Sequence, residues 1–183
     1  MARSIYYLPG SGGRLEAGLG QALLSRGYKV GGRESVGDFQ RLRFDERVGL
    51  VAGDLEADFW RDDALVVANS FGAYLFLHAQ AGLPPFPGKV LLLSPIVGEA
   101  TAPKGGLQFV PPYARRLLEL AQVGSMPIPR LCEMHVGSED WQSDPVAVTR
   151  LASLLGLPVT VVPGDGHMLG KDYVGRLLDG WLG

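Results

Sequence analysis

The strongest candidate for a catalytic residue in this sequence is a serine that lies between a predicted strand and a predicted helix. Ser70 comes just after the apolar run Ala64–Ala68, and a helical pattern begins directly behind it. Such a sharp turn holds a serine in a strained conformation with its hydroxyl exposed, provided that small residues stand two positions before and after it. Ala68 and Gly72 meet that condition. The alternative is a serine that only caps a buried helix.

A nucleophilic serine needs a base, and the sequence has three histidines. His167 lies in a glycine-rich loop just after the apolar run Val159–Val162. Catalytic groups collect at the carboxyl edge of a parallel sheet, so this position favours a base. His78 falls in an apolar helical pattern and His135 inside a weaker strand pattern, and we expect both to be structural.

The base in turn needs an acid to orient it. Asp140 follows the run Leu131–Val136 and is our candidate, with Glu139 and Asp144 as competitors. Asp144 also suits the N-cap of a helix that begins with proline. Asp165 is expected to shape the histidine loop. The chain order serine, aspartate, histidine is that of α/β hydrolases and differs from the chymotrypsin and subtilisin orders.

The turn Leu8-Pro9-Gly10-Ser11-Gly12-Gly13 follows the apolar run Ile5–Leu8, and its backbone N–H groups suit an anion. A dinucleotide fingerprint would place a small residue at Leu15 and a ribose-binding acid at Glu34, which fits poorly. No Gly-Lys-Ser/Thr follows the glycines, so a phosphate-binding loop is also disfavoured. We therefore expect the anion to be a transient oxyanion.

These residues require a scaffold of alternating strands and helices. Short apolar runs predict buried parallel strands at 5–8, 64–68, 90–93 and 159–162, and weaker ones at 28–30 and 131–136. Helical patterns cover 14–26, 47–60, 71–81, 113–123, 145–155 and 171–182. The fold class is α/β: one doubly wound domain over 1–183, with a mainly parallel sheet of about six strands and helices on both faces. The proline-rich segment 99–130 is expected to form a short flap or insertion.

Composition excludes several classes of protein. With 183 residues, 46% of them hydrophobic, and a net charge of −2, the chain gives no reason to expect a nucleic acid or membrane partner. The lone Cys132 rules out an intrachain disulfide and is expected in the core. The apolar run near the start is too short for a signal peptide, and none reaches the ~18 residues of a membrane span. A cytoplasmic protein is the expectation.

Five stretches resemble the α/β-hydrolase superfamily over nearly the whole chain. YYLPGSGG resembles the oxyanion strand and turn, VVANSFGAYLFLHA the nucleophile elbow, VLLLSPIVG the next strand, GSEDWQSDP the acid loop, and VTVVPGDGHMLGKDYVGRLLDGWL the histidine loop and last helix. The chain looks like a small, cap-less bacterial serine esterase, with retinoblastoma-binding-protein-type serine hydrolases as a related group. Pro9 stands where the family often has histidine.

This resemblance implies a serine hydrolase that cleaves small acyl esters or thioesters without cofactor or metal. Ser70, Asp140 and His167 would form the triad, and the backbone N–H of Phe71 with that of Ser11 or Gly10 would form the oxyanion hole. The loop-edge residues that could line an apolar acyl pocket are Trp141, Met168, Phe109 and Tyr113. The alternative is a binding protein of hydrolase fold with little turnover. The oligomeric state is left open.

Overall fold

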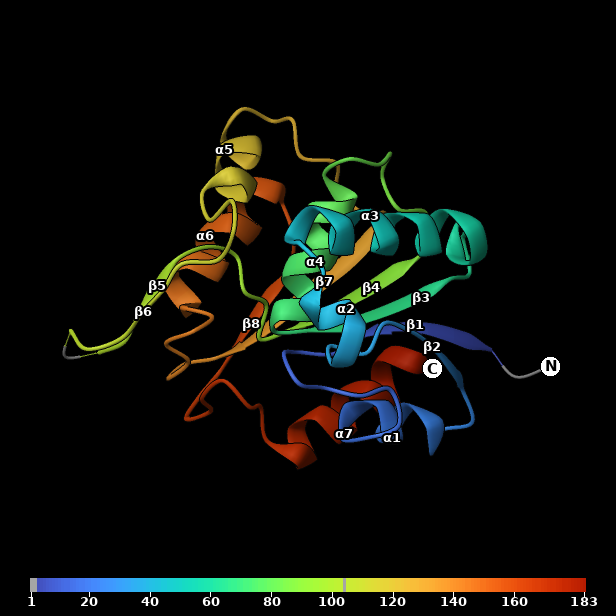
Figure 1. The fold of residues 1–183 in the computed structure, drawn as a ribbon. Coiled ribbons are helices and arrows are strands. Elements are labelled where there is room, and N and C mark those ends of the chain that lie inside the picture. The colour runs from blue at the N-terminus through green and yellow to red at the C-terminus, as the bar shows by residue number, and fades with distance from the viewer. Residues whose placement is uncertain (1–2, 104) are drawn as a thin grey trace.

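A six-stranded parallel sheet forms the centre of the structure, a computed structural model that describes residues 3–103 and 105–183 (Figure 1). Its strands lie in the order β2-β1-β3-β4-β7-β8. Their bounds are β1 Ser4–Leu8, β2 Lys29–Gly32, β3 Leu65–Asn69, β4 Lys89–Leu93, β7 Leu131–Gly137 and β8 Val159–Val162. All six predicted strands are therefore present, and every pair between them is parallel.

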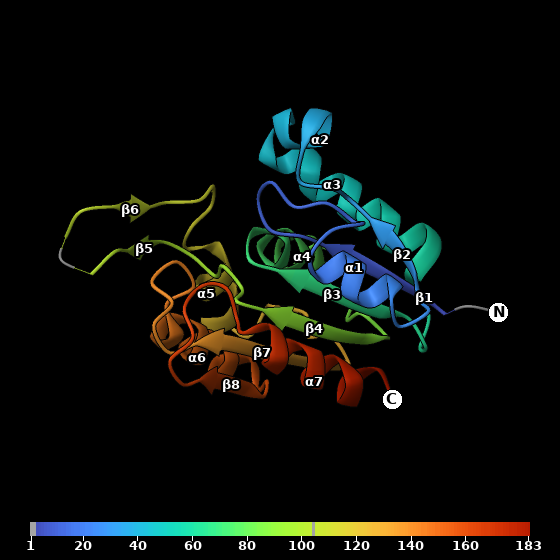
Figure 2. The same ribbon diagram turned by 90° about the horizontal axis from the view of Figure 1, so that it is seen from below.

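Helices cover both faces of this sheet. Their bounds are α1 Leu19–Leu24, α2 Gly37–Arg41, α3 Phe44–Asp54, α4 Phe71–Gln80, α5 Arg116–Gln122, α6 Pro145–Leu155 and α7 Lys171–Leu182. A π-helical turn, Leu55–Phe59, continues α3. In Figure 2, which looks from below, α1 and α7 lie on the near side of the sheet. The fold is thus the expected doubly wound α/β architecture.

Two clusters of buried apolar residues, one on each face of the sheet, hold the helices against it. Alternate strand residues point to opposite faces, so Tyr6 and Val66 belong to one cluster while Ile5 and Val67 belong to the other. The larger cluster packs against α3, α4, α5 and α6, and the smaller one packs against α1 and α7. Strands buried on both faces read as continuous apolar runs, which is why the sequence identified them.

Two helices on the N-terminal side differ from the sequence expectations. The helix predicted over 14–26 shortens to α1, because the chain folds back there and a Cβ on Gly20 would lie 1.9 Å from the backbone oxygen of Leu15. Helix α2, which begins at Gly37 with a φ of 60°, was not predicted.

The segment 99–130 contains a hairpin as well as a helix. Strands β5 (Ala100–Thr101) and β6 (Gln108–Phe109) pair antiparallel, and α5 follows them. Figures 1 and 2 both show this hairpin projecting from the body of the molecule. Its role as a flap stays a prediction, and residues 1, 2 and 104 lie outside the described part of the chain.

The register of the sheet places several loops at one edge. Leu8 pairs with Ala68, Asn69 with Leu93, Leu93 with His135, and Gly137 with Val162. Because the strands are parallel, their carboxyl ends meet, and the loops that follow them gather at this edge. In the described part of the chain, no helix is long and apolar enough to cross a membrane.

Candidate active site

Ser70 lies at a sharp turn between β3 and α4. Its φ of 55° and ψ of −120° are unusual for any residue other than glycine, so the turn stores backbone strain. Gly72 permits the turn, since a Cβ there would lie 2.1 Å from the backbone oxygen of Leu8. The strained backbone directs the Ser70 hydroxyl to His167, rather than back to α4 as a helix cap would require.

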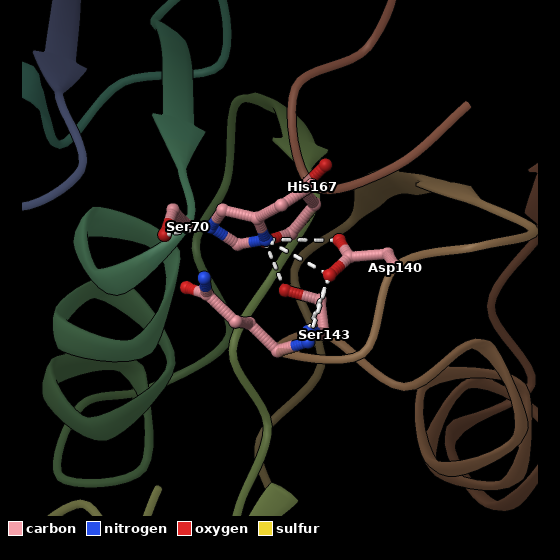
Figure 3. A network of polar contacts seen from close by, with 6 residues as sticks. Ser70, Asp140, Ser143 and His167 are labelled. Atoms are coloured by element: carbon pink, nitrogen blue, oxygen red, sulfur yellow. Dashed lines mark hydrogen bonds and ion pairs between the residues drawn. The ribbon is translucent and has the colours of Figure 1, made fainter. Parts of the chain in front are cut away.

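Three side chains from distant parts of the sequence form one chain of hydrogen-bonding contacts (Figure 3). The Oγ of Ser70 lies 2.7 Å from Nε2 of His167. On the other side of the ring, Nδ1 of His167 lies 3.0 Å and 2.9 Å from the two carboxylate oxygens of Asp140. The imidazole can therefore accept the serine proton at one nitrogen while the carboxylate holds the N–H at the other.

The carboxylate of Asp140 is buried, and backbone groups hold it in place. Its Oδ1 accepts hydrogen bonds of 2.9 Å from the backbone N–H groups of Gln142 and Ser143. The side chain of Asp140 is 0% exposed, whereas that of His167 is 23% exposed. A buried carboxylate needs such partners, and these two fix its orientation toward the imidazole ring. The sequence analysis missed both donors, although an aspartate that bonds to the backbone two and three residues on is a common turn feature.

The glycine-rich turn after β1 lies against the nucleophile. A Cβ placed on Gly10 would lie 3.1 Å from the Cβ of Ser70 and 3.5 Å from its Oγ, so a side chain at this position would crowd Ser70. Gly10 and Ser11 line the same cavity as Ser70. Phe71 begins α4, so its N–H has no partner within the helix. The backbone of Gly10 and the start of α4 therefore both lie next to the Ser70 side chain.

Pro9 and Ser35 determine the shape of that turn. Gly12 donates a hydrogen bond to the backbone oxygen of Ser35, and Ser35 donates to that of Gly13. Pro9 is buried, and a Cβ on Gly13 would lie 2.5 Å from the Cβ of Pro9. Pro9 therefore packs against Gly13 inside the turn.

Ser70 and His167 line a cavity of about 870 Å³, whereas Asp140 does not reach its wall. Two of the four predicted pocket residues line this cavity and two do not. Phe109 and Met168 line it together with Phe71, and Met168 is 85% exposed. Trp141 is half-buried and Tyr113 is exposed, and neither lies on the cavity wall. The Tyr113 hydroxyl instead donates a 3.2 Å hydrogen bond to Asp45. Asn69 and Gln142 line the cavity without having been predicted.

The other acidic residues near the candidate triad do not contact the imidazole of His167. Asp144 caps α6, where its Oδ1 accepts a 3.0 Å hydrogen bond from the N–H of Val146. Asp165 accepts one of 2.8 Å from the N–H of Gly170, which shapes the histidine loop. Glu139 is exposed. Only Asp140, among the acids considered, contacts the His167 ring.

The remaining histidines and the cysteine are buried away from this contact chain. Burial lowers the pKa of His78 to about 4. It also lowers the pKa of His135, whose Nδ1 lies 2.6 Å from the Tyr173 hydroxyl. Burial, with the charge of Glu133, raises the pKa of the Cys132 thiol to about 12, so this thiol is not a nucleophile at neutral pH. Within the described ranges, no group of three His, Cys, Asp or Glu side chains could hold a metal ion.

Comparison with known proteins supports the fold. No protein-family model and no curated protein matches the sequence. Among solved structures, carboxylesterase CesB from Bacillus subtilis is similar with a TM-score of 0.69 at 15% identity, covering 99% of this chain and 84% of that one. Mouse alpha/beta hydrolase domain-containing protein 10 is similar with a TM-score of 0.68 at 14% identity, covering 98% of this chain and 89% of that one.

A third structure extends over a similar share of the chain. The predicted CIB-like hydrolase from Thermoplasma acidophilum has a TM-score of 0.65 at 17% identity, covering 98% of this chain and 86% of that one. All three comparisons span nearly the whole chain, and the parallel six-stranded sheet with helices on both faces agrees with them. The chain therefore has the α/β-hydrolase fold.

Proposed function

We propose that this protein is a serine hydrolase that cleaves carboxylic ester or thioester bonds through an acyl-enzyme. The observation that carries the proposal is the continuous contact from Ser70 Oγ through His167 to the buried carboxylate of Asp140. The strained backbone at Ser70 supports the proposal further, because residues with such strained backbone angles cluster at active sites. The hydrolases and the carboxylesterase of similar fold agree with this activity.

The acylation step uses the two sides of the imidazole. Ser70 Oγ attacks the carbonyl carbon while its proton passes to Nε2 of His167, 2.7 Å away. Asp140 holds the N–H at Nδ1 and stabilises the imidazolium that forms. The backbone N–H groups of Phe71 and of Gly10 or Ser11 would donate to the oxyanion, and one such donor is worth about 2.7–4 kcal/mol. The bond to the leaving group then breaks, and the leaving group receives the proton from His167.

The deacylation step repeats the same movements with water. His167 removes a proton from a water molecule, which attacks the acyl carbon bound to Ser70. The ester bond to Oγ breaks, Oγ regains its proton from His167, and the acid leaves. None of these steps needs a metal or an organic cofactor.

A fluorophosphonate probe tests the proposal, because it phosphonylates only an activated serine. We expect the wild type to be labelled and to hydrolyse p-nitrophenyl acetate, and Ser70→Ala to do neither. Ser153→Ala is the matched control, because Ser153 is an exposed serine on α6, away from the cavity. His167→Ala should also lose turnover. A folded wild type that is neither labelled nor active would instead favour a binding protein of hydrolase fold.

A further inference from the structure

The cavity at Ser70 continues past the catalytic residues as a groove between α1 and α7. Leu19 and Ala22 line it from α1, and Val174, Gly175 and Leu178 line it from α7. The two helices lie side by side on one face of the sheet (Figures 1 and 2), and side-chain contacts join them. The groove thus starts at the nucleophile and follows the helices away from it.

The groove suits an uncharged chain. Leu93 and Leu178 are buried where they line the groove, and Leu19, Ala22, Val174 and Gly175 are half-buried. The polar residues Gln21, Ser25 and Lys171 also line the cavity, and all three are exposed. None of the described residues that line the cavity is acidic. The charge of Arg26 is paired, since its Nε donates a 2.8 Å hydrogen bond to Asp179. Lys171 is exposed, so its ammonium group remains in water. An apolar chain would therefore displace water from the apolar walls without burying an unpaired charge.

Arg26 closes the far end. Its Nη1 donates a 2.9 Å hydrogen bond to the backbone oxygen of Ala22, and its Nη2 donates one of 3.1 Å to that of Gly175. The guanidinium therefore bridges α1 and α7. At 1.5 Å per helical residue, Leu19 and Arg26 are about 10 Å apart along the direction of α1. An extended chain advances about 1.2 Å per bond, so this length accommodates about eight carbons.

We propose that this groove binds the unbranched acyl chain of the substrate and that Arg26 sets its limit at about eight carbons. The inference rests on the proposed function. It assigns the groove to the acyl group rather than the alcohol because the groove is closed at Arg26. The leaving group must depart while the acyl group is still bound to Ser70, and a closed groove suits the group that stays.

Chain-length profiles test this assignment. With p-nitrophenyl esters of straight acyl chains, kcat/KM should rise about fourfold per methylene up to octanoate and then level off or fall. In Gly175→Leu the ratio of octanoate to acetate kcat/KM should fall at least about tenfold, because the side chain fills the groove. A Cβ at Gly175 approaches only Nη2 of Arg26, at 3.8 Å, so the variant has room to fold.

Matched variants separate the groove from general effects on α7. Gly180→Leu lies on the same helix, where a Cβ meets nothing within 4 Å, and it should keep the wild-type profile. Arg26→Ala removes the end of the groove and should shift the optimum to longer chains. A flat wild-type profile, or one that Gly175→Leu leaves unchanged, overturns the inference. So does a profile that follows the alcohol chain in a series of acetates.

A binding measurement keeps this inference separate from the proposed function. Octanoate should bind the Ser70→Ala and Ser70→Ala/Gly180→Leu variants in calorimetry, and binding should be lost in Ser70→Ala/Gly175→Leu. Octanoate binding without any fluorophosphonate labelling of the wild type contradicts the proposed function alone. Ester hydrolysis without chain-length dependence contradicts the groove assignment alone.

Discussion

The hydroxyl of Ser143 donates a 2.6 Å hydrogen bond to the backbone oxygen of Ser94, and this bond ties the acid loop to the end of β4. Both residues are buried. Ser94 is itself anchored, because its N–H donates a 2.7 Å hydrogen bond to the backbone oxygen of His135. Since the N–H of Ser143 also donates to Asp140, the position of the carboxylate depends on the neighbouring strands β4 and β7.

We expect Ser143→Ala to lower kcat about fivefold to tenfold with little change in KM for a short ester. Loss of this buried bond costs about 1–1.4 kcal/mol in the positioning of Asp140, and this cost affects the turnover step more than substrate binding. Steady-state kinetics with p-nitrophenyl acetate measure the split between kcat and KM. Ser143→Thr keeps the hydroxyl and should restore most of kcat, and Ser153→Ala should match the wild type. Equal losses in the alanine and threonine variants would indicate a packing effect only.

Asp140 and Asp144 offer a matched pair for the identity of the acid. Asp140→Asn should lower kcat by about four orders of magnitude, because the amide cannot hold the imidazole in the required tautomer. Asp144→Asn should keep full activity, since asparagine caps a helix as well as aspartate does. The melting temperatures should stay close to that of the wild type. An active Asp140→Asn enzyme, or an inactive Asp144→Asn enzyme, would move the acid away from Asp140.

Gly72 makes the turn at Ser70 sterically possible. Gly72→Ala should lower the free energy of unfolding by about 3 kcal/mol, because its Cβ would overlap the backbone of Leu8, at the end of β1, and of Pro9 directly after it. Urea denaturation at neutral pH measures the change. Gly82→Ala is the control, since a Cβ there meets its nearest neighbour, the backbone oxygen of Ala79, at an ordinary 3.6 Å. Similar losses in both variants would show that the effect is not specific to the turn.

The strands could be predicted from the sequence, and the short elements could not. Apolar runs such as Val90–Leu93 are buried on both faces, so their composition alone distinguishes them. The observed bounds of helix α6 agree with the predicted ones, because Asp144 and Pro145 mark its start and Gly156, whose backbone is in the left-handed region, marks its end. Helix α2 and the β5–β6 hairpin are stabilised by few periodic apolar residues, so the sequence carried no comparable signal for them.

The meeting of the candidate site residues was predictable where it depended on chain order and strand ends, while their catalytic roles stay a prediction. Ser70, Asp140 and His167 each follow a strand, and parallel pairing brings strand ends to one edge. The groove was not predictable, because it depends on the distance between α1 and α7 rather than on any local pattern. Tyr113 illustrates the same limit: its place near a loop edge suggested a pocket wall, but its hydroxyl bonds to Asp45 instead.

His78 predicts an acid-sensitive stability. The residue is 4% exposed, and its ring packs edge-on against Phe44 and Tyr74, with ring centroids 5.0 Å and 4.3 Å away. Burial is the main reason that its pKa falls to about 4, and the positive charge of Arg116 adds to the shift while Asp45 opposes it. The Nε2 of His78 is buried and has no hydrogen-bond partner among the described residues. The folded protein therefore favours the neutral ring.

The protein should lose stability as the pH falls, because the pKa of His78 is lower in the folded chain than in the unfolded chain. As the pH falls below the pKa of histidine in the unfolded chain, about 6.5, the unfolded chain binds a proton at His78. The folded chain does not bind this proton until the pH reaches about 4. Stability is thus fully present above about pH 6.5 and is lost as the pH falls toward 4.

After allowance for solvent screening, His78 should account for about 1 kcal/mol of the stability lost between about pH 7 and about pH 5. His78→Phe keeps an aromatic ring in the cluster, so urea denaturation should show a smaller loss over that interval than in the wild type. The depressed pKa of His135 acts in the same direction, so the variant reduces the pH dependence without abolishing it. If His78→Phe and the wild type lose equal stability, the buried ring already accepts a proton near pH 5 and the burial argument fails.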